Sequence, residues 1–506
     1  MRRTIPGLAF FLVCVLYSST AVTQIIEWEV GLTSNRALIR ARGVSAAVQA
    51  APTILYLAGL TGNTGFSDEL ESILENYART EERSRPVKLI IIPVANPDGE
   101  ELIFPPLGRA YAENPVSHAL WRWIGTHAPD LVIVAGQDAG GFVDALQGEA
   151  VASFGSIPVQ VFSTRTTGLN FLLALQQAEA SEASLELARR LVRTPAELAD
   201  QLAQSYGYNF STPAYVPGMS LIGRMRLGQM QEIEIQLQPY LTGSAIEVYN
   251  ASVMAGQLVF AEFAERTGNA AARQLTINAA ELAFDEQGNP RAAMPMHAEM
   301  SDSFFMVTPL LVKAGKLTAE SKYFDMAARH VNYMREMLVQ ENGLYRHSPE
   351  ADVAWSRGNG FPALGMALSL SDFPETHPAY GALMSIFIHH LESLLPYQDV
   401  DGMWHEVIDY PGSFAEITST AMIGIAIKRG LDRNWLPAAT YQPVLDKIWR
   451  AVSIRTSLGG EFINACTSTG KMPSLDAYLD RPAILGRDDR AGGVVMLFAN
   501  EMAGNR

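Results

Sequence analysis

The chain has 506 residues, a formal net charge of −15 at pH 7 and 48% hydrophobic residues. This length and hydrophobic content predict two or more domains with sizeable cores. The negative charge disfavours nucleic acid and anionic lipid as partners, because both are polyanions. An acidic substrate would therefore need local arginine and histidine side chains.

The first 21 residues have the order of a secretory signal peptide. Two arginines are followed by an apolar run over residues 8–17 and then by small residues up to Ala21. The run is too short to span a bilayer, so we predict cleavage after Ala21, a periplasmic or extracellular mature protein, and no membrane partner. Cleavage would remove Cys14 and leave only Cys466, so no intramolecular disulfide is expected.

Residues 22–170 have the pattern of an α/β domain with a mostly parallel sheet. Short runs rich in isoleucine, valine and leucine occupy residues 53–60, 87–94 and 131–135, with helix-compatible segments between them. Buried parallel strands have this pattern, because helices cover both faces of their sheet. A further strand is expected within residues 27–42.

Residues 171–243 are interpreted as a connector of mixed helical and strand character. The pattern is helical between residues 165 and 207. Residues 232–237 (EIEIQL) alternate apolar and polar side chains, which predicts a half-buried strand.

From residue 244 to residue 506 the pattern predicts helices without strands. The expected helices cover residues 245–267, 270–285, 302–317, 320–340, 357–372, 377–397, 415–430, 442–456 and 488–502. The first helices of successive pairs begin about 55 residues apart, the length of two helices and their loops. Such a repeat forms either a solenoid or a closed ring. Long loops rich in Trp, His and Gly favour the ring, so we predict an all-α (α/α)6 barrel of six hairpins.

Asp302 is a candidate catalytic residue and also a candidate helix cap. It stands directly before the apolar start of a predicted helix, residues 303–306. As an N-cap, its carboxylate would accept the first free amides of its own helix. As a catalytic group, it would point into a cavity instead. The sequence leaves both alternatives open.

Residues 355–361 (WSRGNGF) form a second candidate site motif. Two glycines around Asn359, near a helix start, cost stability and indicate a close approach or a need for backbone freedom. Arg357 offers a bidentate fork for a carboxylate, and Trp355 and Phe361 offer flat faces for a sugar ring. The structural alternative is an arginine that pairs with an internal aspartate beneath a packed tryptophan.

His347 and His405 end two loops at matching points of the repeat, each near an aromatic residue. This arrangement predicts that they line a shared rim. Neither has the spacing of zinc ligands, so no metal and no cofactor is expected. Trp404 precedes His405, and Thr418 opens the next predicted helix, where capping is the default role.

Together these motifs resemble those of the unsaturated glucuronyl and rhamnogalacturonyl hydrolases, glycoside hydrolase families 88 and 105. The resemblance covers residues 244–503 and rests on motifs in a fixed order, at residues 302–306, 355–361, 401–405 and 416–422. It implies the same six-hairpin (α/α)6 barrel.

The resemblance also implies an activity. Such enzymes remove a 4,5-unsaturated uronic acid from the non-reducing end of oligosaccharides that polysaccharide lyases produce. By analogy, Asp302 would protonate the vinyl ether double bond and deliver water to the neighbouring carbon. The side chains implied in substrate binding are Asn250, His347, Trp355, Arg357, Asn359, Phe361, Trp404, His405 and Thr418.

Two departures from the family pattern leave other functions open. Asn250 or Ser252 stands near the place where many members have a second aspartate, and Phe361 replaces a tryptophan. Sugar epimerases share this barrel and use paired histidines as acid and base, which His347 and His405 would allow. An inactive carbohydrate-binding protein is the third alternative. The sequence carries no signal for the oligomeric state.

Residues 54–63 and 93–99 resemble, more faintly, the zinc carboxypeptidase domain. Thr61 and Thr64 stand where that family has its metal-binding His and Glu, and threonine is not a suitable zinc ligand. The resemblance implies a metal-free domain that binds, packs or supports.

Overall fold

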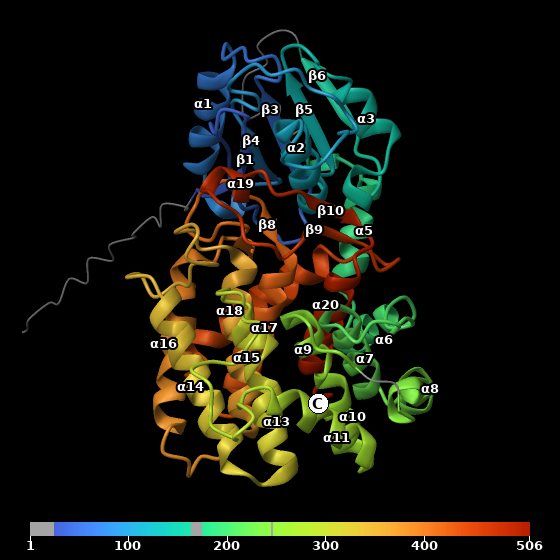
Figure 1. The fold of residues 1–506 in the computed structure, drawn as a ribbon. Helices are drawn as coiled ribbons and strands as arrows, with labels where there is room; N and C mark the ends of the chain where they lie inside the picture. Colours follow the sequence, from blue (N-terminus) through green and yellow to red (C-terminus); the bar gives the residue numbers. More distant parts are fainter. Residues whose placement is uncertain (1–24, 163–174, 244–245, 506) are drawn as a thin grey trace, which may run out of the picture.

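The computed structural model describes residues 25–162, 175–243 and 246–505. The predicted signal peptide lies outside the described residues. The chain forms an N-terminal sheet domain and a C-terminal helical domain, which lie one above the other in Figure 1. No helix within the described ranges is both long and apolar enough to cross a membrane.

Within the described residues, six strands form the sheet of the N-terminal domain, in the order β1-β2-β4-β3-β5-β6. The parallel strands are β3 (Thr53–Ala58), β4 (Lys88–Ile92), β5 (Leu131–Ala135) and β6 (Val159–Phe162). An antiparallel hairpin of β1 (Ile26–Leu32) and β2 (Leu38–Val44) extends one edge. The mostly parallel sheet is therefore confirmed, although the region expected to hold one early strand holds two.

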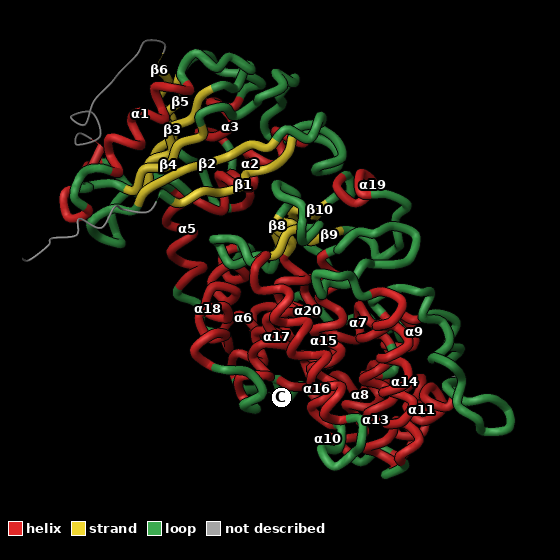
Figure 2. The backbone as a smooth tube through the Cα atoms, turned by 90° about the vertical axis from the view of Figure 1, so that its left-hand side faces the viewer, coloured by secondary structure: helices red, strands yellow, loops and turns green. Residues whose placement is uncertain are grey.

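Helices cover both faces of this sheet. Ile54 and Tyr56 on β3 pack with α1 (Ser67–Ala78), whereas Leu55 and Leu57 pack on the opposite face with α2 (Pro115–His127). The sheet face that α2 covers shares its apolar core with Ile454 and Ile463 of the helical domain. A further helix, α3 (Phe142–Gly148), lies between β5 and β6 in the chain. Figure 2 shows the strands side by side above the helical domain.

The loops of the sheet domain that resemble a zinc carboxypeptidase meet each other. A Cβ atom on Gly62 would lie 2.9 Å from the Cα of Gly99, which brings the loop after β3 against the loop after β4. Among the residues that the structure describes, no group of three or more His, Cys, Asp or Glu could hold a metal ion. The carboxypeptidase likeness stays a prediction.

One set of helices in the helical domain forms a closed series of contacts. Each contacts the next in the order α7, α10, α13, α15, α17 and α20, and α20 contacts α7. We call these, with the short helices α9 and α12, the inner helices. Their bounds are α7 (Tyr215–Arg226), α9 (Ala251–Gly256), α10 (Leu258–Thr267), α12 (Ser303–Met306), α13 (Thr308–Thr318), α15 (Ser356–Asp372), α17 (Ile417–Asp432) and α20 (Asp489–Ala503).

A second set packs outside this series, each helix against at least one inner helix. We call these the outer helices. They are α8 (Met230–Leu241) on α7, α11 (Ala270–Glu281) on α10, α14 (Ser321–Leu338) on α13, α16 (Tyr380–Leu394) on α15, α18 (Ala438–Ile454) on α17, and α6 (Pro195–Ala203) on α20. Every helix predicted after residue 244 is found, but those expected at 245–267 and 302–317 are each broken into two helices.

The predicted strand at residues 232–237 is wrong, because this segment lies within helix α8. Ile233 and Leu237 are fully buried, while Ile235 between them is 67% exposed. Buried residues four positions apart lie on one face of a helix. An alternating pattern of only six residues is too short to distinguish the helical period of 3.6 from the strand period of 2. The connector also belongs largely to the helical domain, since Leu198 on α6 and Tyr215 on α7 share its core.

The prediction of no strands after residue 244 is also wrong. Two short antiparallel pairs are present, β7 (Trp404–His405) with β8 (Ala415–Glu416), and β9 (Phe462–Cys466) with β10 (Ala483–Gly486). Helix α19 (Leu475–Leu479) follows β9. In Figure 1, β8, β9, β10 and α19 lie between the two domains, and α5 (Glu182–Leu191) runs from one domain towards the other.

Candidate active site

Asp302 stands directly before α12 but does not cap it. Its side chain is 1% exposed and makes no hydrogen bond to the backbone of α12. Instead, Oδ2 lies 2.9 Å from Nε2 of His347, within ion-pair distance, and neither carboxylate oxygen has a hydrogen-bond partner among the described residues. The structure therefore excludes the helix-cap alternative and leaves Oδ1, the oxygen that does not face His347, available to another group.

His347 is held between Asp302 and Tyr478, a residue of α19. Its Nδ1 lies 2.7 Å from the Tyr478 hydroxyl, and the Met472 N–H donates to the same hydroxyl. Burial raises the pKa of Tyr478 to about 12, so the phenol keeps its proton. When this phenol donates to Nδ1, the ring proton of His347 lies on Nε2, the nitrogen that faces Asp302.

The backbone that leads into Asp302 is strained. Met296, Ala298 and Glu299 have φ values of 67°, 50° and 57°, in the left-handed region that non-glycine residues rarely adopt. The Ser301 N–H donates to the His347 carbonyl at 2.9 Å, which ties this segment to the histidine loop. Strain of this kind is common at functional sites, where surrounding contacts hold it in place.

Trp355 extends the site towards the start of α15. The ring centroids of Trp355 and His347 lie 4.3 Å apart. The guanidinium groups of Arg357 and Arg481 lie 4.9 Å and 4.7 Å from the Trp355 ring, and its Nε1–H donates to Oε1 of Glu406 at 2.8 Å. These contacts fix the indole that supports the histidine.

The fork of Arg357 is occupied by the protein itself. Nη1 donates to the carbonyl of Cys466 at 2.9 Å and Nη2 donates to that of Ser468, and the side chain is fully buried. The guanidinium thus holds the segment after β9. No aspartate forms an ion pair with it among the described residues, and its Nε has no hydrogen-bond partner there, so the substrate contact stays a prediction.

Glu406, the fully buried partner of Trp355, was not singled out from the sequence. Its Oε1 also accepts from the thiol of Cys466 at 3.0 Å. Burial, helped by the nearby Glu416 carboxylate and opposed by Arg481, raises the pKa of Glu406 to about 8. Burial also raises the pKa of Cys466 well above its usual range, so the thiol is a hydrogen-bond donor and not a nucleophilic thiolate.

A pH dependence of stability follows from Glu406. Its pKa is higher in the folded than in the unfolded chain, so the stabilisation is complete below the unfolded value near 4.5 and is lost as pH rises through about 8. We expect the Glu406→Gln variant to lose less stability than the wild type between pH 5 and pH 9. Thermal unfolding of both proteins across this range checks the difference. Parallel curves would show that Glu406 does not titrate there.

Four predicted substrate contacts have partners inside the helical domain, and all four are fully buried. Their positions indicate a structural role. Asn359 bonds the backbone of Tyr345 and Trp355, Phe361 stacks on Phe305, Trp404 donates to the carbonyl of Leu394, and Thr418 donates to Glu416.

Asn250 and His405 have partners other than Asp302. Asn250 is exposed and caps α9, where its side chain accepts from the Val253 N–H at 2.9 Å. His405 lies 3.1 Å from the Asp399 carboxylate and lines a cavity between the two domains, which His347 does not line. The two histidines thus face different carboxylates, and their shared rim stays a prediction.

Tyr478 orients His347, and its removal tests that role. We expect Tyr478→Phe to reduce kcat roughly 10- to 100-fold, because a buried Nδ1 left without its donor costs about 1–3 kcal/mol. The loss of the donor also frees the tautomer of His347, so the pH profile of kcat should shift. Tyr441→Phe, another buried tyrosine on α18, is the matched control. An unchanged rate and profile would assign Tyr478 to packing.

Residues 234–505 match the family model of Glycosyl Hydrolase Family 88. The chain belongs to this family. The matched segment contains Asp302, His347, Trp355, Glu406 and Tyr478. It therefore includes the whole Asp302–His347–Tyr478 arrangement.

Two curated relatives are similar to parts of this chain. The unsaturated rhamnogalacturonyl hydrolase YesR of Bacillus subtilis is 27% identical over 217 residues, which cover 41% of this chain and 58% of the relative. An unsaturated 3S-rhamnoglycuronyl hydrolase of an Alteromonas species is 25% identical over 214 residues, which cover 40% of this chain and 50% of the relative. The chain thus spans about half the length of these relatives.

Solved structures show the same fold in the helical part. A possible member of the GH105 family from Salmonella enterica has a TM-score of 0.54 at 21% identity, covering 62% of this chain and 95% of its own. A Family 105 glycoside hydrolase from C. acetobutylicum has a TM-score of 0.52 at 17% identity, and the match covers 60% of this chain and 99% of that chain. The sheet domain is additional to a nearly complete Family 88/105 fold.

Proposed function

We propose that this protein is a glycoside hydrolase that removes a 4,5-unsaturated uronic acid from the non-reducing end of lyase-generated oligosaccharides. The observation that carries the proposal is the buried pair Asp302–His347, in which Oδ2 lies 2.9 Å from Nε2 and neither carboxylate oxygen has a hydrogen-bond partner among the described residues. The Family 88 match and the activities named for the two curated relatives support it. The closed helix series supports an (α/α)6 barrel as the scaffold.

In the proposed reaction, the transferable proton lies on Oδ1 of Asp302, because Oδ2 is the oxygen that faces Nε2 of His347. Asp302 donates this proton to one carbon of the vinyl ether double bond. A water molecule adds its oxygen to the neighbouring carbon and returns a proton to Asp302. The hemiketal opens, the glycosidic C–O bond breaks, and the remaining sugar leaves. A single carboxyl group serves as acid and then as base, so no second carboxylate at a fixed separation is required.

Substrate screening tests the proposal directly. Unsaturated disaccharides from pectin, glycosaminoglycan and ulvan digests would each be incubated with the protein, and the ultraviolet band of the conjugated double bond followed. Loss of the band with release of free sugar is expected for at least one disaccharide. An isomerised sugar with the band intact would indicate an epimerase, and saturable binding without turnover would indicate a binding protein.

The pairing of His347 with Asp302 and of His405 with Asp399 disfavours an epimerase, because its two histidines would have equivalent roles towards one substrate. We also propose that the protein is exported, on the evidence of the signal-peptide pattern alone. Mass spectrometry of the mature protein from its native host would show an N-terminus after Ala21 if this is right.

A further inference from the structure

A cavity of about 420 Å³ lies between the two domains. The sheet domain contributes residues of β1, β2 and α2, and the helical domain contributes residues 396–401, the loop around β7 and β8, and Arg455. Small-molecule sites have volumes of roughly 300–1,000 Å³. Asp302, His347 and Tyr478 are not among the residues that line it, so the cavity is separate from the candidate active site.

Most carboxylates that line this cavity are already committed to partners in the protein. Asp401 is an example: its Oδ1 accepts from the Trp28 indole at 3.1 Å, and its Oδ2 lies 3.3 Å from Nε2 of His127. The same holds for Glu27 with Arg42, Glu29 with the Gly412 N–H, and Asp399 with His405. Asp409, at the exposed rim, is the exception.

Two of the three arginines that line the cavity, Arg40 and Arg455, make no ion pair within the part of the chain that the structure describes. The third, Arg122, is hydrogen-bonded within the protein, and Arg40 is exposed. Arg455, directly after α18, is 5% exposed; its Nε has no hydrogen-bond partner among the described residues, and its Nη1 reaches only the Ala451 carbonyl, at 3.4 Å. A buried N–H without a partner is costly, and a bound carboxylate would satisfy it.

Aromatic side chains line the same cavity. Tyr397 and Tyr410 are partly exposed and stack on no other aromatic ring of the described residues. Flat aromatic faces pack well against the apolar faces of sugar rings. The cavity therefore combines a buried arginine N–H that lacks a hydrogen-bond partner with aromatic surface.

We propose that this interdomain cavity is a second carbohydrate-binding site, specific for an acidic sugar. The sugar carboxylate pairs with Arg455, and the sugar ring packs on Tyr410. The sheet domain thereby takes part in binding through β1, β2 and α2. This site goes beyond the proposed hydrolysis and does not depend on Asp302.

Calorimetric titration of the full-length protein tests the proposal, with saturated trigalacturonate as the acidic probe and a neutral galactose trisaccharide as its counterpart. Neither probe carries the double bond that the proposed reaction consumes. We expect trigalacturonate to bind at least tenfold more tightly than the neutral probe. Arg455→Gln should weaken its binding at least tenfold and remove the preference for the acidic sugar.

Three further variants make the result specific. Tyr410→Ala, at a partly exposed position that tolerates truncation, should weaken both probes. Arg450→Gln changes an exposed arginine on the same helix as a matched control and should bind like the wild type. Asp302→Asn should also bind like the wild type.

The proposal is overturned if the wild type does not bind trigalacturonate, if both probes bind equally, or if the Arg455 and Tyr410 variants bind as the wild type does. Binding that is lost only in Asp302→Asn would place the probe in the candidate active site and would equally overturn it. The disaccharide assay of the proposed hydrolysis follows turnover. A failed binding test would therefore contradict the second binding site without contradicting the proposed hydrolysis.

Discussion

Asp302→Asn is expected to reduce turnover of an unsaturated disaccharide by roughly 10²- to 10⁴-fold, the range that a general acid–base group contributes. Asparagine has nearly the same shape, and its amide oxygen can still accept from Nε2 of His347. It has no proton to give to carbon and cannot accept one from water. The variant should therefore keep its fold and its unfolding temperature while it loses the chemical step.

The measurement is the initial rate of loss of the double-bond absorbance, with thermal unfolding recorded on the same samples. Asp325→Asn is the matched control, because that carboxylate is 67% exposed on α14 and pairs only with His377. Its rate should equal that of the wild type. If Asp302→Asn retains more than a tenth of the wild-type rate, another group supplies the proton.

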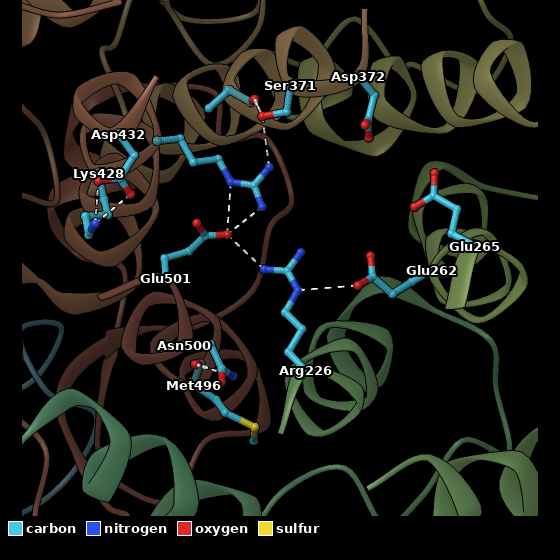
Figure 3. Close-up of polar contacts among 12 residues, drawn as sticks. Arg226, Glu262, Glu265, Ser371, Asp372, Lys428, Asp432, Met496, Asn500 and Glu501 are labelled. Carbon is cyan, nitrogen blue, oxygen red and sulfur yellow. Dashed lines mark hydrogen bonds and ion pairs between the residues drawn. The ribbon is translucent and has the colours of Figure 1, made fainter. Parts of the chain in front are cut away.

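Glu501→Gln is expected to destabilise the helical domain by about 3–5 kcal/mol, the usual cost of breaking a buried ion pair from one side. Glu501 is fully buried at the end of α20, and its Oε1 accepts from Nη1 of Arg226 at 2.8 Å and from Nε of Arg429 at 2.9 Å (Figure 3). These contacts join α7, α17 and α20. Loss of the carboxylate charge would leave two nearly buried guanidinium groups facing each other.

Chemical denaturation followed by circular dichroism measures this loss. Glu320→Gln is the matched control: Glu320 lies 3.3 Å from Lys322 but is 52% exposed, and pairs of that kind contribute about 0–1 kcal/mol. Activity per folded molecule should be unchanged in Glu501→Gln. Arg226, Arg429 and Glu501 lie near the C-terminal ends of α7, α17 and α20, whereas Asp302 stands before the first residue of α12. A loss below 1 kcal/mol would show that water or neighbouring groups replace the carboxylate.

The helices after residue 244 could be predicted because apolar periodicity and turn residues are local signals. Position 302 could be singled out for the same reason, since an acidic residue directly before an apolar helix start is visible in the sequence. The choice between cap and catalyst could not be made, because it depends on where the side chain turns. The structure excludes the cap, because the Asp302 side chain faces His347 on a different hairpin. The catalytic role stays a prediction.

Residues that act over long sequence separations were missed. Tyr478 contacts His347 across 131 residues, and the thiol of Cys466 contacts Glu406 across 60. Nothing local marks these residues as partners. The backbone partners of Arg357 were missed for a related reason. Its guanidinium can bind a substrate carboxylate or a pair of backbone carbonyls, and only the fold brings the end of strand β9 within its reach.

The contact of α20 with both α6 and α7 bears on how this protein can be produced in pieces. A recombinant fragment trimmed to the family match would begin at residue 234 and lack both helices. The face that α20 buries against them would then be exposed to solvent and would favour aggregation. During synthesis, likewise, the helix series cannot close until α20 has left the ribosome. Until then the apolar faces of α6 and α7 that α20 covers are exposed.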